Sequence, residues 1–472
     1  MENQEQTFSE KTNPFNVADV TLARMQRLAP RPTNLQDTGL SEPFVSDLIG
    51  KHLLDGGVLS LVDLTKRLAL AGPIIEGVLN FMRKEARIEV RGSSSQGAAN
   101  GTGHNTSGSL RYVLTDLGRG AAHDAMARGG YIGPAPVPLA KYVEVTNAQT
   151  IHGQRVSREA LTEVFTGTII RQDLLDIIGP AMNSGRAVFI YGHAGTGKTY
   201  ITQMLIRLFP EATLIPYAIS VNETVIEMFD PVLHKRIDSD SDRSDLLLER
   251  GHDPRFANCK RPVIIVGGEL TADMLELHFD PSTRRYQAPL QLKANNGMFI
   301  IDDMGRQRVA PQTVFNRWIV PLEEKRDYLS LGAGRHFTVP FDIVLVFSTN
   351  LHPLDLADES FLRRIGYKIE FPLLRVDEFE QIWQQFCVQN DIRCEADVFE
   401  VVVNELYSTG RHPMLPCHPR DLLSMAVDRA AYRGEERIVS ADHLRWAWQN
   451  YFVSMAPQSR ITNVPANYGE RQ

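Results

Sequence analysis

Cysteine is scarce in this sequence, and long apolar runs are absent from it. The four cysteines (Cys259, Cys387, Cys394 and Cys417) form no C-x-x-C pair, so they predict reduced thiols rather than a zinc site or a disulfide framework. No apolar stretch approaches the ~18 residues that a membrane span requires. Residues 1–5 are polar and acidic, unlike a signal peptide. We therefore expect a cytoplasmic protein that does not span a membrane.

The sequence also has no excess of basic residues. The 472 residues include 57 Asp and Glu against 50 Lys and Arg, which gives a formal net charge of −7. Such a chain has no overall attraction to nucleic acid or to an anionic membrane. Hydrophobic residues make up 43% and charged residues 23% of the chain, a composition typical of globular proteins. A chain of this length is expected to form about two to four domains.

The segment Gly192–Thr199 has the pattern G-x-x-x-x-G-K-T of a phosphate-binding P-loop. It follows the apolar run Ala187–Ile190 and precedes the helix-like stretch Tyr200–Leu208, so a buried strand, a glycine-rich turn and a helix start occur in the required order. The glycines allow backbone N–H groups to approach an anion, and the helix N-terminus adds the positive end of its dipole. We expect the segment to bind a nucleoside triphosphate.

Individual residues of this segment have separate expected roles. Lys198 would contact the β- and γ-phosphates, and the hydroxyl of Thr199 would bind Mg²⁺. The residues predicted to contact ATP here are Gly192, His193, Ala194, Gly195, Thr196, Gly197, Lys198, Thr199 and Tyr200.

A second element of the nucleotide site is predicted far downstream. The apolar run Met298–Ile301 predicts a buried strand, and it ends in Asp302-Asp303, the form of a Walker B motif. Asp302 would hold Mg²⁺. Asp303 stands where many such ATPases carry a glutamate that orients the attacking water. Because aspartate is one methylene shorter, this position affects the expected hydrolysis rate more than nucleotide binding.

Further motifs along the chain resemble those of AAA+ ATPases. The apolar run Ile343–Phe347 is followed by Ser348-Thr349-Asn350, which is similar to sensor 1 of that family. The resemblance implies that Asn350 lies between the Walker B carboxylate and the γ-phosphate of ATP. It covers about residues 156–455. It implies an α/β fold, with an αβα P-loop core and a small α-helical lid.

Two arginine motifs follow in the order that the family has. Phe361–Ile365 resembles the arginine-finger segment, which implies that Arg364, or as second choice Arg363, reaches the ATP site of a neighbouring subunit. An arginine there stabilises charge on the transferred phosphoryl group. His418–Leu423 resembles sensor 2, which implies that Arg420 reaches the phosphates from the lid.

Residues 326–339 predict a β-hairpin, because two alternating segments flank Gly332–Gly334. A hairpin at this place resembles the pre-sensor-1 hairpin of one AAA+ group, and residues 322–350 are most similar to MoxR-like ATPases. In ring-forming relatives such hairpins point toward the central pore, which makes Arg335 and the hairpin tip candidate substrate contacts. The alternative is a hairpin packed only on its own domain.

The distance between the two nucleotide motifs is unusually long. Lys198 and Asp302 are 104 residues apart, more than one helix, one strand and a second helix need. The surplus lies in 217–296 and includes the apolar run Val263–Val266. Such an insertion suits the helix-2-insert group of the family. Either it is a loop that faces a substrate or partner, or it is a surface elaboration.

The segment before the ATPase resembles a winged helix-turn-helix domain. Three expected helices precede two expected strands, and Tyr112–Gly118 is similar to the Y-x-L-T-x-x-G phrase of such domains. Residues 92–109 are almost wholly small and polar, so we expect a disordered wing tip. The expected helices are Pro43–Leu54, Leu61–Leu68 and Pro73–Lys84, and the expected strands are Arg87–Arg91 and Leu110–Leu114.

DNA and protein are both candidate partners of this domain. Residues 43–125 contain nine Lys and Arg against eight Asp and Glu, a net charge of +1, which provides little neutralisation of phosphates. Asn80, Arg83 and Lys84 in the third expected helix are residue types that contact DNA. Winged helices also dock proteins, so the fold alone does not decide between the partners.

The expected chain has six segments. They are a flexible N-terminal segment (1–42), a winged-helix-like domain (43–125), a linker (126–155), an AAA+ core (156–375), a helical lid (376–455) and a polar tail (456–472). Amphipathic patterns in the lid predict helices over 376–390, 395–408, 420–434 and 441–453.

The resemblance implies an Mg²⁺-dependent ATPase that assembles into a ring, expected to be a hexamer. Binding and hydrolysis of ATP would remodel or assemble a protein partner, whose identity the sequence does not reveal. Two alternatives stay open. One is a DNA-bound regulator or mobile-element ATPase that uses the winged helix. The other is a nucleotide-gated scaffold with slow turnover, with which Asp303 is compatible.

Overall fold

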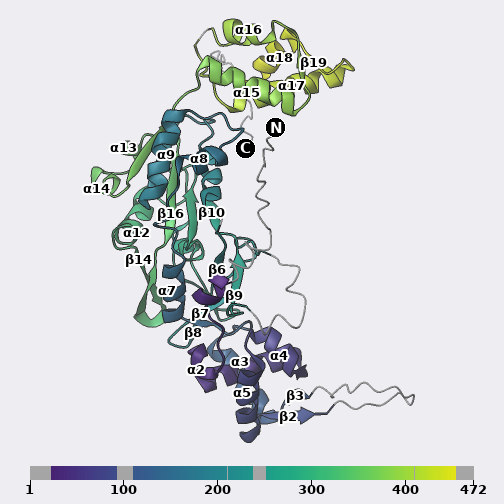
Figure 1. Ribbon diagram of the computed structural model, residues 1–472, viewed down its shortest axis with the longest axis vertical. Helices are drawn as coiled ribbons and strands as arrows, with labels where there is room; N and C mark the ends of the chain where they lie inside the picture. Colours follow the sequence, from purple (N-terminus) through teal and green to yellow (C-terminus); the bar gives the residue numbers. More distant parts are fainter. Residues whose placement is uncertain (1–22, 93–109, 210, 238–250, 409, 453–472) are drawn as a thin grey trace, which may run out of the picture. The chain divides into compact units, whose positions relative to one another are not determined.

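The structure is a computed structural model in which the chain forms two compact units (Figure 1). Unit one comprises 1–166, 172–191 and 199–369, and unit two comprises 167–171, 192–198 and 370–472. The residues described are 23–92, 110–209, 211–237, 251–408 and 410–452. Nearly all of the expected wing tip (92–109), residues 1–22 of the expected N-terminal segment, most of the charged stretch 236–243 within the expected insertion and the polar tail lie outside them. In the described part of the chain, no helix is long and apolar enough to cross a membrane.

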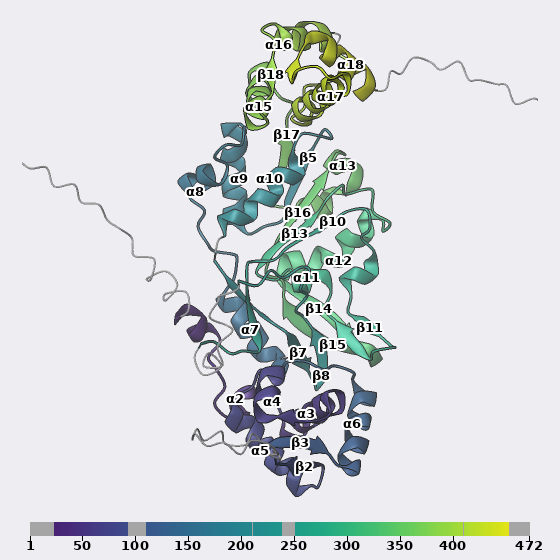
Figure 2. The ribbon, with the colours of Figure 1, turned by 90° about the vertical axis from the view of Figure 1, so that its right-hand side faces the viewer.

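A five-stranded sheet with the order β10-β13-β16-β5-β17 forms the centre of the α/β fold (Figure 2). Its strands from β10 to β5 pair in parallel, and those from β13 to β5 are apolar on both faces, as expected of a sheet covered on both sides. The strands are β10 (Val263–Val266), β13 (Gly297–Ile301), β16 (Ile343–Thr349), β5 (Val188–Gly192) and β17 (Tyr367–Phe371).

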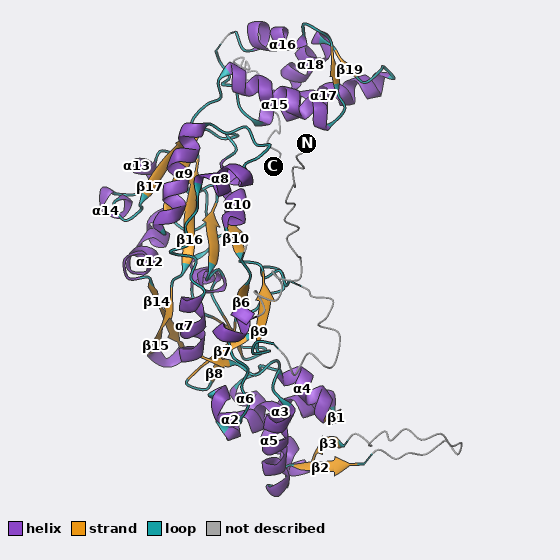
Figure 3. Cartoon of the chain, in the orientation of Figure 1, coloured by secondary structure: helices purple, strands orange, loops and turns teal. Residues whose placement is uncertain are grey.

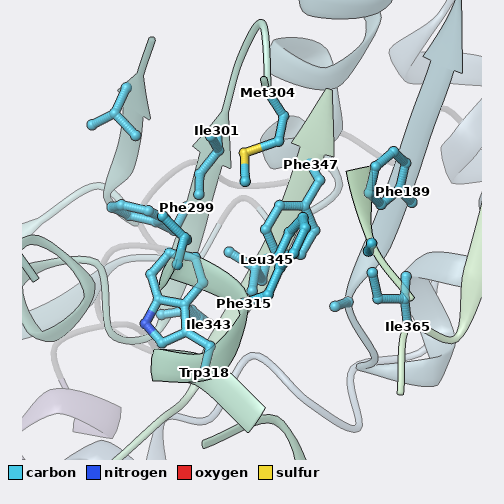
Figure 4. Close-up of a cluster of buried hydrophobic side chains, with 14 of the residues drawn as sticks. Phe189, Phe299, Ile301, Met304, Phe315, Trp318, Ile343, Leu345, Phe347 and Ile365 are labelled. Carbon is cyan, nitrogen blue, oxygen red and sulfur yellow. The ribbon is translucent and has the colours of Figure 1, made fainter. Parts of the chain in front are cut away.

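The core beside this sheet is built around Trp318, which is fully buried on α12 (Pro311–Glu324) (Figure 4). The indole stands edge-on to Phe299 of β13, with ring centroids 5.4 Å apart. Phe315 of the same helix contacts Phe347 of β16 at 5.5 Å. Aromatic contacts of this kind fix α12 against the two central strands.

Short helices and turns complete unit one around the sheet. Helix α10 follows the P-loop, and α8 packs against α9 and the 3₁₀ turn η1. The bounds are α8 (Arg158–Val164), α9 (Gln172–Ser184), α10 (Lys198–Met204), η1 (Leu205–Leu208), η4 (Ala272–Leu275), α11 (Leu290–Lys293), α13 (Pro353–Leu356) and α14 (Glu359–Leu362).

The predicted β-hairpin is confirmed as β14 (Arg326–Leu331) and β15 (Arg335–Pro340), joined by the 3₁₀ turn η5 (Gly332–Gly334). Its side chains alternate between buried and exposed along β14. The apolar face packs in one cluster with Tyr142 and with strands β7 (Ala218–Val221) and β8 (Thr224–Glu227). The hairpin is therefore half-buried on its own unit, and its other face is open to solvent.

The expected insertion over 217–296 requires a correction. The apolar run 263–266 is β10, which pairs with β13 and belongs to the central sheet. A count of residues could not reveal this, because the pairing joins segments more than thirty positions apart. The surplus is thus split around β10. Its strands are β7 (Ala218–Val221), β8 (Thr224–Glu227), β9 (Phe256–Cys259), β11 (His278–Asp280) and β12 (Arg285–Gln287).

A second five-stranded sheet, in the order β11-β12-β8-β7-β4, joins all of these strands except β9 to β4 (Val137–Pro138). The range expected to be a linker, 126–155, holds β4 and helix α7 (Leu139–Ala148), so it is folded structure. The prolines and glycines of this range led to the linker prediction. That prediction was wrong because Pro138 lies in the edge strand and directly precedes α7. Beside this sheet, β6 (Thr213–Pro216) pairs with β9.

The helices and strands predicted in the N-terminal region are confirmed. Ser41 and Ser60 cap the N-termini of α3 and α4, with side chains that accept hydrogen bonds from backbone N–H groups. Helices α2 and α6 were not predicted. Helix α6 follows the strands, and α2 lies within 1–42, so this part of the segment expected to be flexible is folded. The bounds are α2 (Leu35–Thr38), α3 (Glu42–Gly56), β1 (Leu59–Ser60), α4 (Leu61–Leu68), α5 (Gly72–Lys84), β2 (Ile88–Arg91), β3 (Arg111–Leu114) and α6 (Asp116–Arg128).

Unit two is mainly helical (Figure 3), as the amphipathic patterns predicted. Its core contains Phe379, Leu422, Leu423 and Leu444, all fully buried. One strand pair, β18 with β19, completes the unit. The bounds are α15 (Val376–Gln389), β18 (Arg393–Cys394), α16 (Val398–Val401), the π-turn η6 (Val402–Leu406), α17 (Cys417–Arg433), β19 (Ile438–Val439) and α18 (Ala441–Tyr451).

One buried ion pair joins three distant segments of unit one. Arg255 and Asp253 are 2% and 1% exposed, and the guanidinium forms a bidentate pair with the carboxylate. The same guanidinium donates to the carbonyl oxygens of Thr38 and Pro136, at 2.9 and 3.2 Å. Its burial is tolerated because each of these groups is paired.

We predict that Arg255→Met lowers the free energy of unfolding by about 3–5 kcal/mol, because it leaves the Asp253 carboxylate buried without its partner. Arg67→Met is the matched control, since Arg67 and Asp55 form an exposed ion pair. It should cost no more than about 1 kcal/mol. Urea unfolding followed by circular dichroism measures both, and equal losses would contradict the role of the buried pair.

Candidate functional site

Two predicted magnesium ligands lie in contact in unit one. Asp302 follows the last residue of β13, and its Oδ2 accepts a hydrogen bond from Thr199 Oγ1 at 2.7 Å. Thr199 lies in the first turn of α10. A hydroxyl and a carboxylate oxygen are hard ligands of the kind that Mg²⁺ prefers. Among the described residues, no group of three or more His, Cys, Asp and Glu could hold a metal.

The predicted water-orienting acid and the sensor 1 residue are also in contact. Asn350, directly after β16, donates from Nδ2 to Asp303 Oδ1 at 2.8 Å. Asp303 has a left-handed backbone, with φ of 52°. This conformation costs a residue with a Cβ about 1–2 kcal/mol. The turned backbone brings the short aspartate side chain to the end of the neighbouring strand.

Gln307 is a residue of this site that the sequence analysis missed. Its Nε2 donates to the carbonyl oxygens of Asp302 and Asp303, at 2.9 and 3.1 Å. Its Oε1 accepts a hydrogen bond from the N–H of Gly305 at 2.7 Å. No motif spacing marks a glutamine at this place, and the one local signal is the glycine that permits a turn after the acids.

In unit two, the P-loop has the backbone that its glycines were expected to permit. Gly192, Gly195 and Gly197 all have positive φ. A Cβ on Gly195 would lie 2.8 Å from Cys417 Sγ, so this glycine is required by space as well as by conformation. Lys198 is buried, and its ammonium donates to the carbonyl oxygens of Gly192 and His193 at 3.0 and 2.7 Å.

The remaining P-loop residues differ in exposure. His193, Ala194 and Tyr200 are exposed, whereas Thr196 is buried and donates to the carbonyl oxygen of His193 at 2.9 Å. The exposed residues leave the outer side of the loop accessible from solvent.

The two candidate finger arginines have different environments in unit one. Arg364 Nε forms a 2.6 Å ion pair with Glu323 of α12, and its Nη1 donates to the carbonyl oxygen of Ser360. Arg363 is exposed, and among the described residues its guanidinium has no hydrogen bond or ion pair. Arg363, the second choice from the sequence, is therefore the more exposed of the two arginines.

The predicted sensor 2 residue lies near the start of α17 in unit two. Arg420 is exposed and pairs with Asp421 at 2.9 Å, which raises the pKa of the guanidinium. The neighbouring His418 is buried and bonded to the Tyr407 hydroxyl, and burial lowers the pKa of His418 to about 4. His418 is thus uncharged near neutral pH, and Arg420 carries the positive charge of this motif.

Comparisons with known proteins give one partial match to a family. A domain of unknown function (DUF8689) matches residues 375–450, which contain the helices of unit two. This is less than half of the chain, so the match assigns no family to the whole. The search of curated proteins gave no match.

The similarity of this chain to solved structures is weak. NtrX from Brucella abortus is 13% identical, with 66% of this chain covered, 58% of that chain covered and a TM-score of 0.37. The chain thus spans under two thirds of the NtrX structure. The RuvB Holliday junction branch migration motor of Thermotoga maritima is 12% identical, with 62% and 68% covered and a TM-score of 0.32. Likenesses at these scores assign no function.

We predict that Lys198→Ala lowers the affinity for ATP by about a hundredfold or more, because it removes the ammonium that would contact two phosphates. Titration with a fluorescent ATP analogue measures this. Lys368→Ala is the matched control, since Lys368 Nζ also donates to a backbone carbonyl oxygen but lies outside the P-loop. An unchanged affinity of the Lys198 variant would overturn the P-loop assignment.

Proposed function

We propose that this protein is an Mg²⁺-dependent AAA+ ATPase. The observation that carries the proposal is the 2.7 Å hydrogen bond from Thr199 to Asp302. Thr199 directly follows the P-loop lysine in sequence, so the bond links the phosphate-binding motif to the Walker B acid. When bound, Mg²⁺ would neutralise phosphate charge.

The protein's own residues then supply positioning and charge. Lys198 and the P-loop N–H groups hold the phosphates, and Thr199 with Asp302 holds the metal ion. Asp303 orients the attacking water and accepts its proton, while Asn350 holds the Asp303 carboxylate in place. Arg420 adds positive charge toward the phosphates.

We further propose that the protein acts as a ring of subunits, expected to be hexameric, of the MoxR-like group with a pre-sensor-1 hairpin. Arg363 of one subunit would complete the ATP site of its neighbour. The helices of 375–450 would serve as the lid, and the N-terminal domain, as a winged helix, would recruit a protein partner. The exposed face of the hairpin, which includes Tyr328 and Arg335, is the proposed substrate contact.

One observation favours DNA as an alternative partner. Arg91 of β2 stands directly opposite Arg111 of β3, and both are exposed. Like charges directly opposite each other destabilise a strand pair, and an anionic partner would remove that repulsion. In this second candidate function the protein is a DNA-bound regulator whose assembly ATP controls. DNA retention that weakens steeply with salt would support it.

The proposed function predicts an ATPase rate per subunit that rises with protein concentration, because each site needs a neighbour's arginine. Asp303→Asn should reduce the rate by about a hundredfold or more, since it removes the base that orients water. Stimulation by duplex DNA would support the second candidate, whereas indifference to DNA favours a protein partner. A near-zero rate at every concentration would contradict the enzyme and favour a nucleotide-gated scaffold.

We predict that Arg363→Ala lowers kcat by about a thousandfold and leaves the affinity for ATP within about twofold, because a finger acts on transition-state charge. Arg364→Ala is the paired variant, which should lose mainly the contact with Glu323. Turnover at saturating protein concentration and ATP titration measure the two effects. Normal turnover of the Arg363 variant with loss in the Arg364 variant would restore Arg364 as the finger.

A further inference from the structure

The loop after β13 holds the proposed catalytic aspartate in an unfavourable backbone conformation. Asp303 has a φ of 52°, and Gly305, two residues later, has a φ of 107°. Glycine adopts such angles without strain. Aspartate adopts them more readily than most residues, but the conformation still costs free energy that surrounding contacts offset. Within the turn, the Arg306 N–H donates to the Asp303 carbonyl oxygen at 3.0 Å, and a further contact from a side chain stabilises Asp303.

The amide of Gln307 supplies this contact from one side. It donates to the carbonyl oxygens of Asp302 and Asp303, which are the groups on both sides of the strained residue. Its Oε1 also accepts a hydrogen bond from the N–H of Gly305, which completes a small ring of hydrogen bonds within the loop. One half-buried side chain thus pairs with three backbone groups of residues 302–305.

Strand β16 fixes the same loop from the other side. The N–H of Met304 donates to the carbonyl oxygen of Ser348 at 2.8 Å, and Thr349 Oγ1 donates to the carbonyl oxygen of Met304 at 2.7 Å. These bonds attach the loop to the strand that carries Asn350. Asp303 is therefore held between Gln307 and β16, and its carboxylate meets Asn350 at 2.8 Å.

The other close partner of the carboxylate is too exposed to orient it. Arg306 Nη1 lies 3.8 Å from Asp303 Oδ2, and the arginine side chain is 73% exposed. Ion pairs of this kind contribute little order. The direction of the Asp303 side chain thus depends on its backbone angles, which Gln307 holds.

We propose that Gln307 is a positioning residue for ATP hydrolysis, which acts through Asp303 and touches neither nucleotide nor water. This inference rests on the proposed ATPase function. The aspartate is one methylene shorter than the glutamate common at this place, and the left-handed turn brings its carboxylate to Asn350. Gln307 maintains that turn, so a shorter acid can perform the same task.

A residue that only stabilised the fold would have different effects. Its loss would lower the fraction of folded protein, and with it ATP binding and turnover together. A positioning residue for Asp303 changes kcat and leaves nucleotide affinity intact, because the phosphates are held by the P-loop. Its effect also vanishes once the Asp303 carboxylate has been removed.

The test compares Gln307→Ala with Gln312→Ala, the matched control. Gln312 is an exposed glutamine of α12 whose amide donates to one carbonyl oxygen, that of Leu356. We expect Gln307→Ala to lower kcat about tenfold, as the loss of two orienting hydrogen bonds implies, with the affinity for ATP unchanged within about twofold. Hydrogen exchange at the Gly305 amide should accelerate in Gln307→Ala and remain unchanged in Gln312→Ala.

Gln307→Ala made in an Asp303→Asn background tests whether Gln307 acts through the Asp303 carboxylate. Asparagine tolerates the left-handed conformation, so the turn is preserved while the carboxylate charge is lost. Gln307→Ala should then cause no further fall in kcat. A further tenfold fall, or faster Gly305 exchange with normal turnover of the single variant, would overturn the proposal.

Failure of the proposed function gives a different result. If the unaltered protein binds ATP but never hydrolyses it, the ATPase function and the positioning role both fail. Hydrogen exchange at Gly305 then still reports whether Gln307 fixes the loop, because that measurement needs no turnover. If the unaltered protein hydrolyses ATP and Gln307→Ala matches it in kcat, the positioning role alone fails.

Discussion

The parallel pairing of β5, β16 and β13 is the constraint on which the proposed site depends. Since the three strands run in one direction, their carboxyl ends meet at one edge of the sheet. The register pairs Ile301 with Phe347 and Thr349 with Tyr191, so the residues that follow β13 and β16 come within hydrogen-bond reach. Thr199 meets Asp302, and Asn350 meets Asp303, because the sheet aligns three chain segments that are far apart in sequence.

Structural features that depend on short stretches of sequence were predictable. The P-loop, the strand ending in Asp302-Asp303 and the hairpin over 326–339 each follow from a local pattern of glycine, apolar or alternating residues. The helices of the N-terminal region and of unit two follow from amphipathic spacing and capping residues. In all these cases the physical cause lies within about fifteen residues of the feature.

Features that depend on distant partners were not predictable. The loop that holds Asp303 is bonded to Gln307 and to β16, and the ion pair of Arg364 involves Glu323, forty-one positions away. The place of β10 in the central sheet and the folding of 126–155 against β7 likewise arise from pairings that no local pattern encodes. Sequence reasoning found the residue types of the site and missed the contacts that orient them.

Strand β7 has a consequence for the modularity of the molecule. Its Ala218 packs in the core of the N-terminal helices, while the adjacent Ile219 packs in the cluster that contains the hairpin. Two successive residues of one short strand thus point to opposite faces and pack in two different hydrophobic cores. The N-terminal helices cannot be deleted or exchanged independently of the rest of unit one, because their removal would expose the apolar side chain of Ala218 on β7. The N-terminal helices and the rest of unit one therefore form one folding unit rather than separable modules.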